Sequence, residues 1–114
     1  MVHSSIRMVI PSNKRLEAQG ILISVAERTR IEPGCINCQV YQGAENKQAI
    51  LMDELWRNNE DLECHLRSED YLKVLLVVEM AIEKPELRFD TITCSTGVDM
   101  IEKARKTLRT HSKR

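Results

Sequence analysis

Apolar and polar residues change their spacing along the chain in a way that separates strands from helices. In the segment Ile6–Ile10 every second residue is apolar, which predicts a first strand that Pro11 ends. Over residues 14–31 the apolar residues recur at helical spacing, and the side-chain oxygens of Ser12 and Asn13 are expected to cap this helix. Proline and glycine at 33–34 are expected to end this helix, because proline cannot continue the amide ladder and glycine can take positive φ.

A pair of strands is expected after this helix. Ile36–Gly43 alternates apolar and polar residues, and Gln48–Trp56 reads as the next strand. The loop of about four residues between them predicts an antiparallel hairpin. Both faces of Gln48–Trp56 are largely apolar, so this strand is expected to be central and covered on both sides, with Glu54 and Trp56 at the end of one face.

The second half of the chain predicts two helices, a strand and a last helix. A short helix is expected at 60–66, and Ser68 with the acids after it marks the start of a longer, unusually apolar helix at 71–82. A fourth strand follows at 87–91. The final helix is expected at 98–109, and its apolar residues form a short stripe of Met100, Ile101, Ala104 and Leu108.

This order of elements predicts an α+β fold with a ferredoxin-like βαββαβ arrangement, an antiparallel sheet and an extra C-terminal helix. The 114 residues are expected to form one domain, with a core at about 6–95 and the extra helix at 97–109. Both main helices are expected on one face of the sheet. The other face would expose apolar side chains, so we expect a homodimer in which two sheets pack face to face.

The balance of charged residues limits the kinds of binding partner that are expected. The chain has 17 basic and 17 acidic residues, so no general attraction to nucleic acid or to a membrane surface is expected. The six Lys or Arg within 103–114 are expected to form a solvated helix face. No secretion signal and no run of about 20 apolar residues is present, which predicts a cytoplasmic protein.

Four cysteines are expected to be reduced thiols in that compartment. Cys35 and Cys38 form a C-x-x-C pair, a spacing that serves either metal binding or thiol redox chemistry. The pair runs into a strand rather than a helix, and Cys64 and Cys94 form no second close pair. Ordinary thiols and no metal site are therefore expected.

Candidate functional residues gather within 53–71. The end of an apolar strand supplies Glu54 and the only tryptophan, Trp56, and the next short helix supplies His65. A carboxylate, an indole and an imidazole thus fall within thirteen residues, and this is the stretch in which functional residues are expected.

Four motifs resemble the antibiotic biosynthesis monooxygenase family of the dimeric α+β barrel superfamily. They are Glu-Pro-Gly-Cys at 32–35, Glu-Leu-Trp at 54–56, His-Leu-Arg-Ser-Glu-Asp-Tyr at 65–71 and Pro-Glu-Leu-Arg-Phe at 85–89. The resemblance covers about residues 6–95. It implies a homodimer and a pocket between sheet and helices that accepts a small apolar or aromatic ligand.

The resemblance also implies a chemistry. In the cofactor-free oxygenases of this family, a hydroxyarene is deprotonated and its anion passes electrons to O₂, so a quinol or phenolic metabolite is the expected substrate and no cofactor is expected. Trp56 would flank the substrate and His65 would accept or share its proton. Glu54 would orient the histidine or a water, and Tyr71 would hydrogen-bond the substrate. Haem degradation is not expected, because residues 73–77 lack the iron-ligating histidine of that branch.

Each assignment has a structural alternative. Trp56 and Tyr71 can be core residues, His65 can bridge helices, and Glu54 can pair with Arg57 or Arg88. Two other functions therefore stay open: a noncatalytic stress or regulatory module that binds a small ligand, and a purely structural domain whose own side chains fill the pocket. Solvent access to His65 and Trp56 separates the structural domain from the other two.

Overall fold

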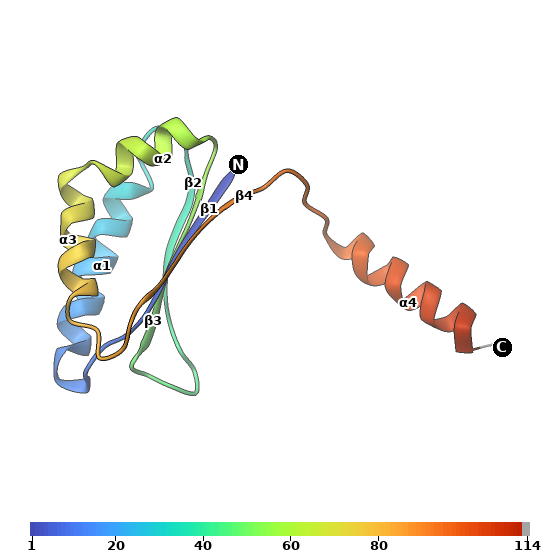
Figure 1. The fold of residues 1–114 in the computed structure, drawn as a ribbon, viewed down its shortest axis with the longest axis horizontal. Coiled ribbons are helices and arrows are strands. Elements are labelled where there is room, and N and C mark those ends of the chain that lie inside the picture. The colour runs from blue at the N-terminus through green and yellow to red at the C-terminus, as the bar shows by residue number, and fades with distance from the viewer. Residues whose placement is uncertain (113–114) are drawn as a thin grey trace.

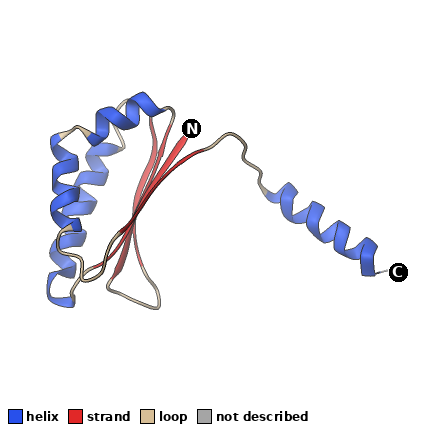
Figure 2. Cartoon of the chain, viewed as in Figure 1, coloured by secondary structure: helices blue, strands red, loops and turns tan. Residues whose placement is uncertain are grey.

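The computed structural model describes residues 1–112, with side chains described as far as Lys106. Helices and strands alternate in the order that the sequence predicts (Figures 1 and 2). The elements are β1 (Val2–Val9), a short 3-10 turn η1 (Ser12–Lys14), α1 (Arg15–Thr29), β2 (Cys35–Gln42), β3 (Ala49–Trp56), α2 (Asn59–Leu66), α3 (Glu69–Val78), β4 (Glu86–Thr91) and α4 (Val98–Ser112).

Four strands form one antiparallel sheet in the order β2-β3-β1-β4. Figure 1 shows α1 and α3 side by side on one face of this sheet, and an Arg28–Asp70 ion pair of 2.9 Å joins the two helices. The α+β, ferredoxin-like arrangement with both main helices on one face is therefore confirmed.

β3 carries the core on one face only. Ile50, Met52, Glu54 and Trp56 point toward the helices and are buried, whereas the alternate residues are half-buried on the open face. The strand lies in the interior of the sheet, as predicted. The expectation that both faces are covered is wrong for the single chain, because all helices that contact the sheet lie on one side.

Some element boundaries differ from the prediction. β1 begins at Val2 rather than Ile6, since Val2 and Ser4 pair with Trp56 and Glu54 of β3. The polar Ser4 hides this extension from a search for apolar alternation. α1 begins at Arg15 after the 3-10 turn, and no side chain caps its start, so the expected cap by Ser12 and Asn13 is wrong.

α3 starts at Glu69 and ends at Val78, four residues before the predicted end at residue 82. Its start is capped as predicted, because Ser68 Oγ accepts a hydrogen bond of 3.2 Å from the Tyr71 amide. The chain leaves the helix early because the amide of Ile82 donates to the carbonyl of Val9 at 2.8 Å. Pairing with the end of β1 thus replaces the last predicted turn of helix.

α4 stands apart from the rest of the molecule. Residues 92–97 link it to β4, and Figure 1 shows it projecting on the side of the sheet opposite to α1 and α3. The molecule is consequently elongated, with a longest dimension of 57 Å. The predicted helix at 98–109 is present, but the side chain of Leu108 lies outside the described residues. Within residues 1–112, no helix is long and apolar enough to cross a membrane.

Candidate functional site

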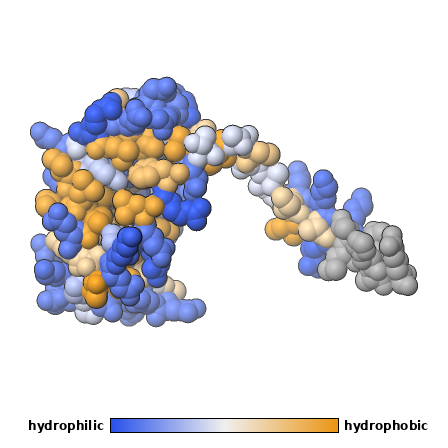
Figure 3. All heavy atoms as spheres, in the orientation of Figure 1, coloured by the Kyte–Doolittle hydropathy of each residue, from blue (hydrophilic) through white to orange (hydrophobic). Residues whose placement is uncertain are grey.

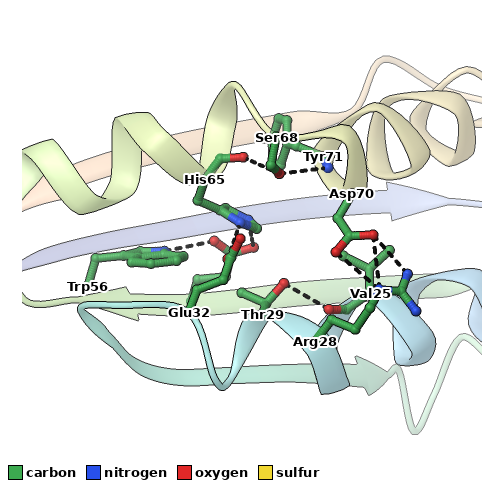
Figure 4. A network of polar contacts seen from close by, with 10 residues as sticks. Val25, Arg28, Thr29, Glu32, Trp56, His65, Ser68, Asp70 and Tyr71 are labelled. Carbon is green, nitrogen blue, oxygen red and sulfur yellow. Dashed lines mark hydrogen bonds and ion pairs between the residues drawn. The ribbon is translucent and has the colours of Figure 1, made fainter.

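The candidate site is built around His65 in the last turn of α2. Asn58 starts this helix by accepting a hydrogen bond of 2.9 Å from the amide of Asp61, and Leu62 buries its inner face. Three residues on, His65 turns inward toward the sheet and is only 1% exposed. Its ring nitrogens both point at carboxylates (Figure 4).

Glu32 holds one of these nitrogens. His65 Nδ1 lies 2.7 Å from Glu32 Oε2, and Glu32 comes from the tight turn between α1 and β2. Gly34 in this turn has a φ of +81°, a conformation that favours glycine. A side chain at Gly34 would also collide with Asp61 of α2. The glycine therefore lets the turn approach α2 closely and brings Glu32 to His65.

Glu54 of β3 contacts the other nitrogen, and Trp56 of the same strand holds Glu54 in place. His65 Nε2 lies 3.2 Å from Glu54 Oε2, and the second oxygen of Glu54 accepts a hydrogen bond of 2.8 Å from Trp56 Nε1. The indole also packs against the imidazole, with 4.8 Å between ring centroids. Because Glu54 and Trp56 are two residues apart on a strand, both point to the same face and can share one partner.

Ser68 connects His65 to the start of α3. Its hydroxyl donates a hydrogen bond of 2.6 Å to the His65 carbonyl and accepts one from the Tyr71 amide. The Tyr71 ring meets the imidazole edge to face at a centroid distance of 5.3 Å. We call Glu32, Glu54, Trp56, His65 and Tyr71 the His65 cluster.

Burial and the neighbouring carboxylates shift the pKa of His65 in opposite directions. Burial, the largest influence, lowers its pKa, but the hydrogen bond and charge of Glu54 and then those of Glu32 outweigh burial and raise the pKa above the usual 6.5. A neutral imidazole could donate to only one of the two carboxylates. The arrangement therefore favours an imidazolium between two acids. Burial and the charge of Glu54 also raise the pKa of Tyr71 to about 12, which keeps its phenol neutral.

Comparisons with known proteins relate this chain to a protein family and to solved structures. The sequence profile of the family described as antibiotic biosynthesis monooxygenase matches residues 1–75. The chain belongs to this family. None of the curated proteins matches it.

Solved structures share the fold of this antibiotic biosynthesis monooxygenase family member. A Nitrosomonas europaea protein named for the same family has 16% identity and a TM-score of 0.74, with 82% of this chain and 100% of that chain covered. One from Deinococcus radiodurans, also named for the family, has 17% identity and a TM-score of 0.77, with coverages of 85% and 97%. A conserved protein from Methanosarcina mazei Go1 reaches 27% identity and a TM-score of 0.72, covering 78% and 89%.

Two cysteines of this family member, Cys35 and Cys38, lie on β2 beside the His65 cluster. Burial, followed by the charges of Glu54 and Glu32, raises the pKa of Cys35 to about 11, and burial raises that of Cys38 further. Both are free thiols, and a thiol with a raised pKa is a poor nucleophile. Among the described residues no group of three or more His, Cys, Asp or Glu is arranged to hold a metal ion.

All four site residues predicted from the sequence meet in the structure. His65, Glu54, Trp56 and Tyr71 form one contact network. The alternative in which Glu54 pairs with Arg57 or Arg88 is wrong, because those arginines pair with Asp61 and Asp90. Whether the four residues catalyse a reaction stays a prediction.

Sequence reasoning missed Glu32 as a member of the cluster, although it opens the Glu-Pro-Gly-Cys motif that helped to identify the family. It also treated Ser68 only as a helix cap. The motif could have drawn attention to Glu32. Its contact with His65, which lies 33 positions later in the sequence, depends on the fold.

The cluster is closed in this structure. Trp56 is 0% exposed, and His65 is almost as completely buried. Two surface cavities, of about 420 and 220 Å³, are lined by other residues: one lies between α1 and α3, and the other lies near the β2–β3 hairpin. By the criterion of solvent access, the single chain resembles a domain that fills its pocket with its own side chains.

Proposed function

We propose that the protein is a cofactor-independent monooxygenase that oxidises a small quinol or phenolic metabolite with O₂ at the His65 cluster. The observation that carries this proposal is the buried imidazole held between Glu32 and Glu54, with Trp56 and Tyr71 against its ring. Two carboxylates beside a buried histidine are not needed for packing, because burying charged groups costs free energy. Such clusters are frequent at functional sites. Family membership supports the same class of chemistry.

In the proposed reaction the substrate hydroxyl replaces the longer of the two histidine contacts, the one between His65 Nε2 and Glu54. Glu32 keeps Nδ1 in place, so a neutral His65 accepts the phenolic proton at Nε2. Trp56 stacks on the aromatic ring, and Tyr71, a neutral phenol, donates to the anion.

The anion then reduces O₂. One oxygen atom forms a bond to a ring carbon and the other leaves as water. A ring CH₂ thereby becomes a carbonyl, or in a quinol a ring C–H becomes C–OH while the quinol becomes a quinone. The substrate loses two hydrogens and supplies all four electrons that O₂ gains. No electron carrier is consumed, and the protein's part is to hold the anion in a dry site.

The closed cluster must open for this chemistry. α2 and α3 cover His65, and their link at Ser68 makes them the elements that would move. Substrate entry is thus proposed to displace the helix layer from the end of β3. Conformational gating of this kind is common in enzymes.

Closure itself favours a second candidate, a noncatalytic ligand-binding or regulatory module of the same fold. If the cluster opens only for a specific ligand, the protein binds this ligand tightly without turnover. A cluster that never opens would make the domain purely structural.

A homodimer through the open sheet face is part of the proposal. The β3 residues Leu51 and Leu55 are half-buried there, and Tyr41 of β2 is exposed beside Leu51, its partner in the strand pairing. Charged residues lie among them, including a His3–Asp53 pair. A second sheet would cover these apolar groups, and the native mass in sedimentation equilibrium measures whether it does. The cytoplasm, where free thiols persist, remains the proposed compartment.

Oxygen uptake tests the proposed activity. The purified chain is assayed against hydroquinones and hydroxynaphthalenes beside His65→Ala, Trp56→Ala and the control Leu16→Ala, which truncates an exposed leucine on α1 outside the cluster and the open face. We expect uptake above autoxidation, and a loss of roughly 100-fold or more in His65→Ala, because general-base catalysis contributes that much.

The control should keep the wild-type rate. Circular dichroism and native mass verify that each variant is folded. Wild-type uptake equal to the buffer rate, or equal rates in wild type and His65→Ala, would overturn the proposed activity. In the first case, saturable binding without turnover would support the regulatory module.

A further inference from the structure

α4 is an amphipathic helix whose apolar side chains, as far as Lys106, are exposed in the single chain. Val98, Met100 and Ile101 are each more than half exposed, and Ala104 is exposed one turn further on. An isolated helix of 15 residues is marginal in water, since most helices depend on packing of their apolar face. This apolar stripe therefore needs a partner surface.

The body of the protein offers a matching apolar surface over α3 and β4. Figure 3 shows hydrophobic side chains gathered over these two elements on the face toward the viewer. Leu76 is 58% exposed and Phe89 is 47% exposed. The surface, here called the α3–β4 strip, consists of the exposed residues Leu72, Leu75, Leu76, Leu87 and Phe89.

The strip results from how the two elements pack. α3 buries Tyr71, Val74 and Val77, which leaves its leucines on the outer side. In β4, Leu87 and Phe89 pair with Ile6 and Ser4 of β1 and so lie on the helix-covered side of the sheet, but all residues of this edge strand are exposed. An exposed edge strand with large apolar residues is a liability unless something covers it.

Charge also matches α4 to the body. α4 contains four Lys or Arg and two acids, a net charge of +2, and Lys113 and Arg114 bring residues 98–114 to +4. The whole chain is neutral, so residues 1–97 carry −4. Residues 79–90, which follow α3 and form β4, contain four acids and two bases, a net charge of −2. The basic helix and the acidic body are therefore electrostatically complementary.

We propose that α4 of each subunit docks on the α3–β4 strip of a second copy, so that two chains exchange their C-terminal helices. A second copy is favoured over the chain's own strip because α4 begins on the opposite side of the sheet from α3 (Figure 1). The link of six residues spans at most about 20 Å. A copy packed on the open sheet face would lie along α4. The exchange does not depend on catalysis.

Disulfide trapping between two differently tagged chains tests the exchange. Cys64 and Cys94, the two exposed cysteines, are first replaced by serine in both chains. One full-length chain then carries Ile101→Cys and the other carries Leu76→Cys. We expect a disulfide between the two tags under mild oxidation, formed at least ten times faster than in the control pair that carries Leu16→Cys on α1. Leu16 is an exposed leucine outside the strip.

Other occupants of the strip give different results. A chain carrying both Ile101→Cys and Leu76→Cys that forms only an internal disulfide would show docking on its own body and overturn the exchange. Equal rates with Leu16→Cys, or no trapped pair, would overturn it as well. As a second measurement, Leu76→Asp should weaken self-association at least tenfold in sedimentation equilibrium, and Leu16→Asp should leave it unchanged.

Discussion

His65 contributes both to the stability of the fold and to the proposed chemistry. Its side chain lies between Glu32 and Glu54, away from water, at distances of 2.7 and 3.2 Å. Removing one partner from such a buried pair leaves a charge without compensation, which typically costs about 3–5 kcal/mol. The same protonated state that stabilises the fold prevents His65 from accepting a proton. Stability and activity should therefore depend on pH in opposite directions.

The free energy of unfolding should fall as pH rises above neutrality. The pKa of His65 is raised in the folded protein above its unfolded value near 6.5. Its stabilising contribution is therefore complete below about 6.5 and is lost as pH rises through the folded pKa. Urea unfolding of wild type and His65→Gln between pH 5.5 and 9 measures this. We expect a difference of about 3 kcal/mol at low pH that narrows toward pH 9.

His3→Gln is the matched control, because it removes the other histidine–carboxylate pair of the described residues. His3 pairs with Asp53 at the half-exposed open face, where pairs contribute little. A difference between wild type and His65→Gln that stays constant over this range would contradict the ion pair.

At the scale of the elements, the turn between α1 and β2 places Glu32 against His65. The amide of Cys35 donates to the Glu32 carbonyl, and the Arg57 amide donates to the Gly34 carbonyl, which ties the turn to the end of β3. The position of Gly34 beside Asp61 fixes the distance between this turn and α2.

Gly34→Ala should lower the free energy of unfolding by more than about 1 kcal/mol. Its φ of +81° disfavours any side chain, and the new Cβ would lie 2.1 Å from Asp61 Oδ2. Gly20→Ala is the matched control, since Gly20 lies within α1 with open space around its Cβ position. That change should stabilise the protein by about 0.5–1 kcal/mol. Urea denaturation measures both, and equal effects would refute the role of the turn.

The order and type of the elements could be predicted because each depends on local spacing. β3 shows its buried row directly, and Ser68 marks the start of α3. The start of β1 could not be predicted, because polar Ser4 is buried only through its pairing with β3 and β4. The early end of α3 depends on a hydrogen bond to Val9, which no local pattern contains.

The site residues that belong to recognisable sequence motifs could be predicted. Glu54, Trp56, His65 and Tyr71 stand within 18 consecutive residues, and a strand followed by a helix turns them toward each other. Two features depend on the whole fold and could not be predicted. One is the approach of Glu32 from the α1–β2 turn, and the other is the complete burial of the cluster.

At the scale of the molecule, a closed helix layer covers one sheet face, while the other face, the α3–β4 strip and α4 are uncovered. Partner subunits are proposed to cover the exposed surfaces. The His65 cluster is instead covered by the chain's own α2 and α3. Function at this cluster therefore requires the helix layer to move, and the central claim is that an aromatic ligand opens it.

Fluorescence of Trp56 tests this claim most directly, because it is the only tryptophan and lies against His65. The chain is titrated with hydroquinones under argon, where binding is measured without turnover, and N-acetyltryptophanamide corrects for absorption and collisional quenching. We predict a saturable change of Trp56 emission in wild type that disappears in folded His65→Ala. Emission that changes no more than that of the free tryptophan derivative would contradict the account and leave the cluster as part of the core.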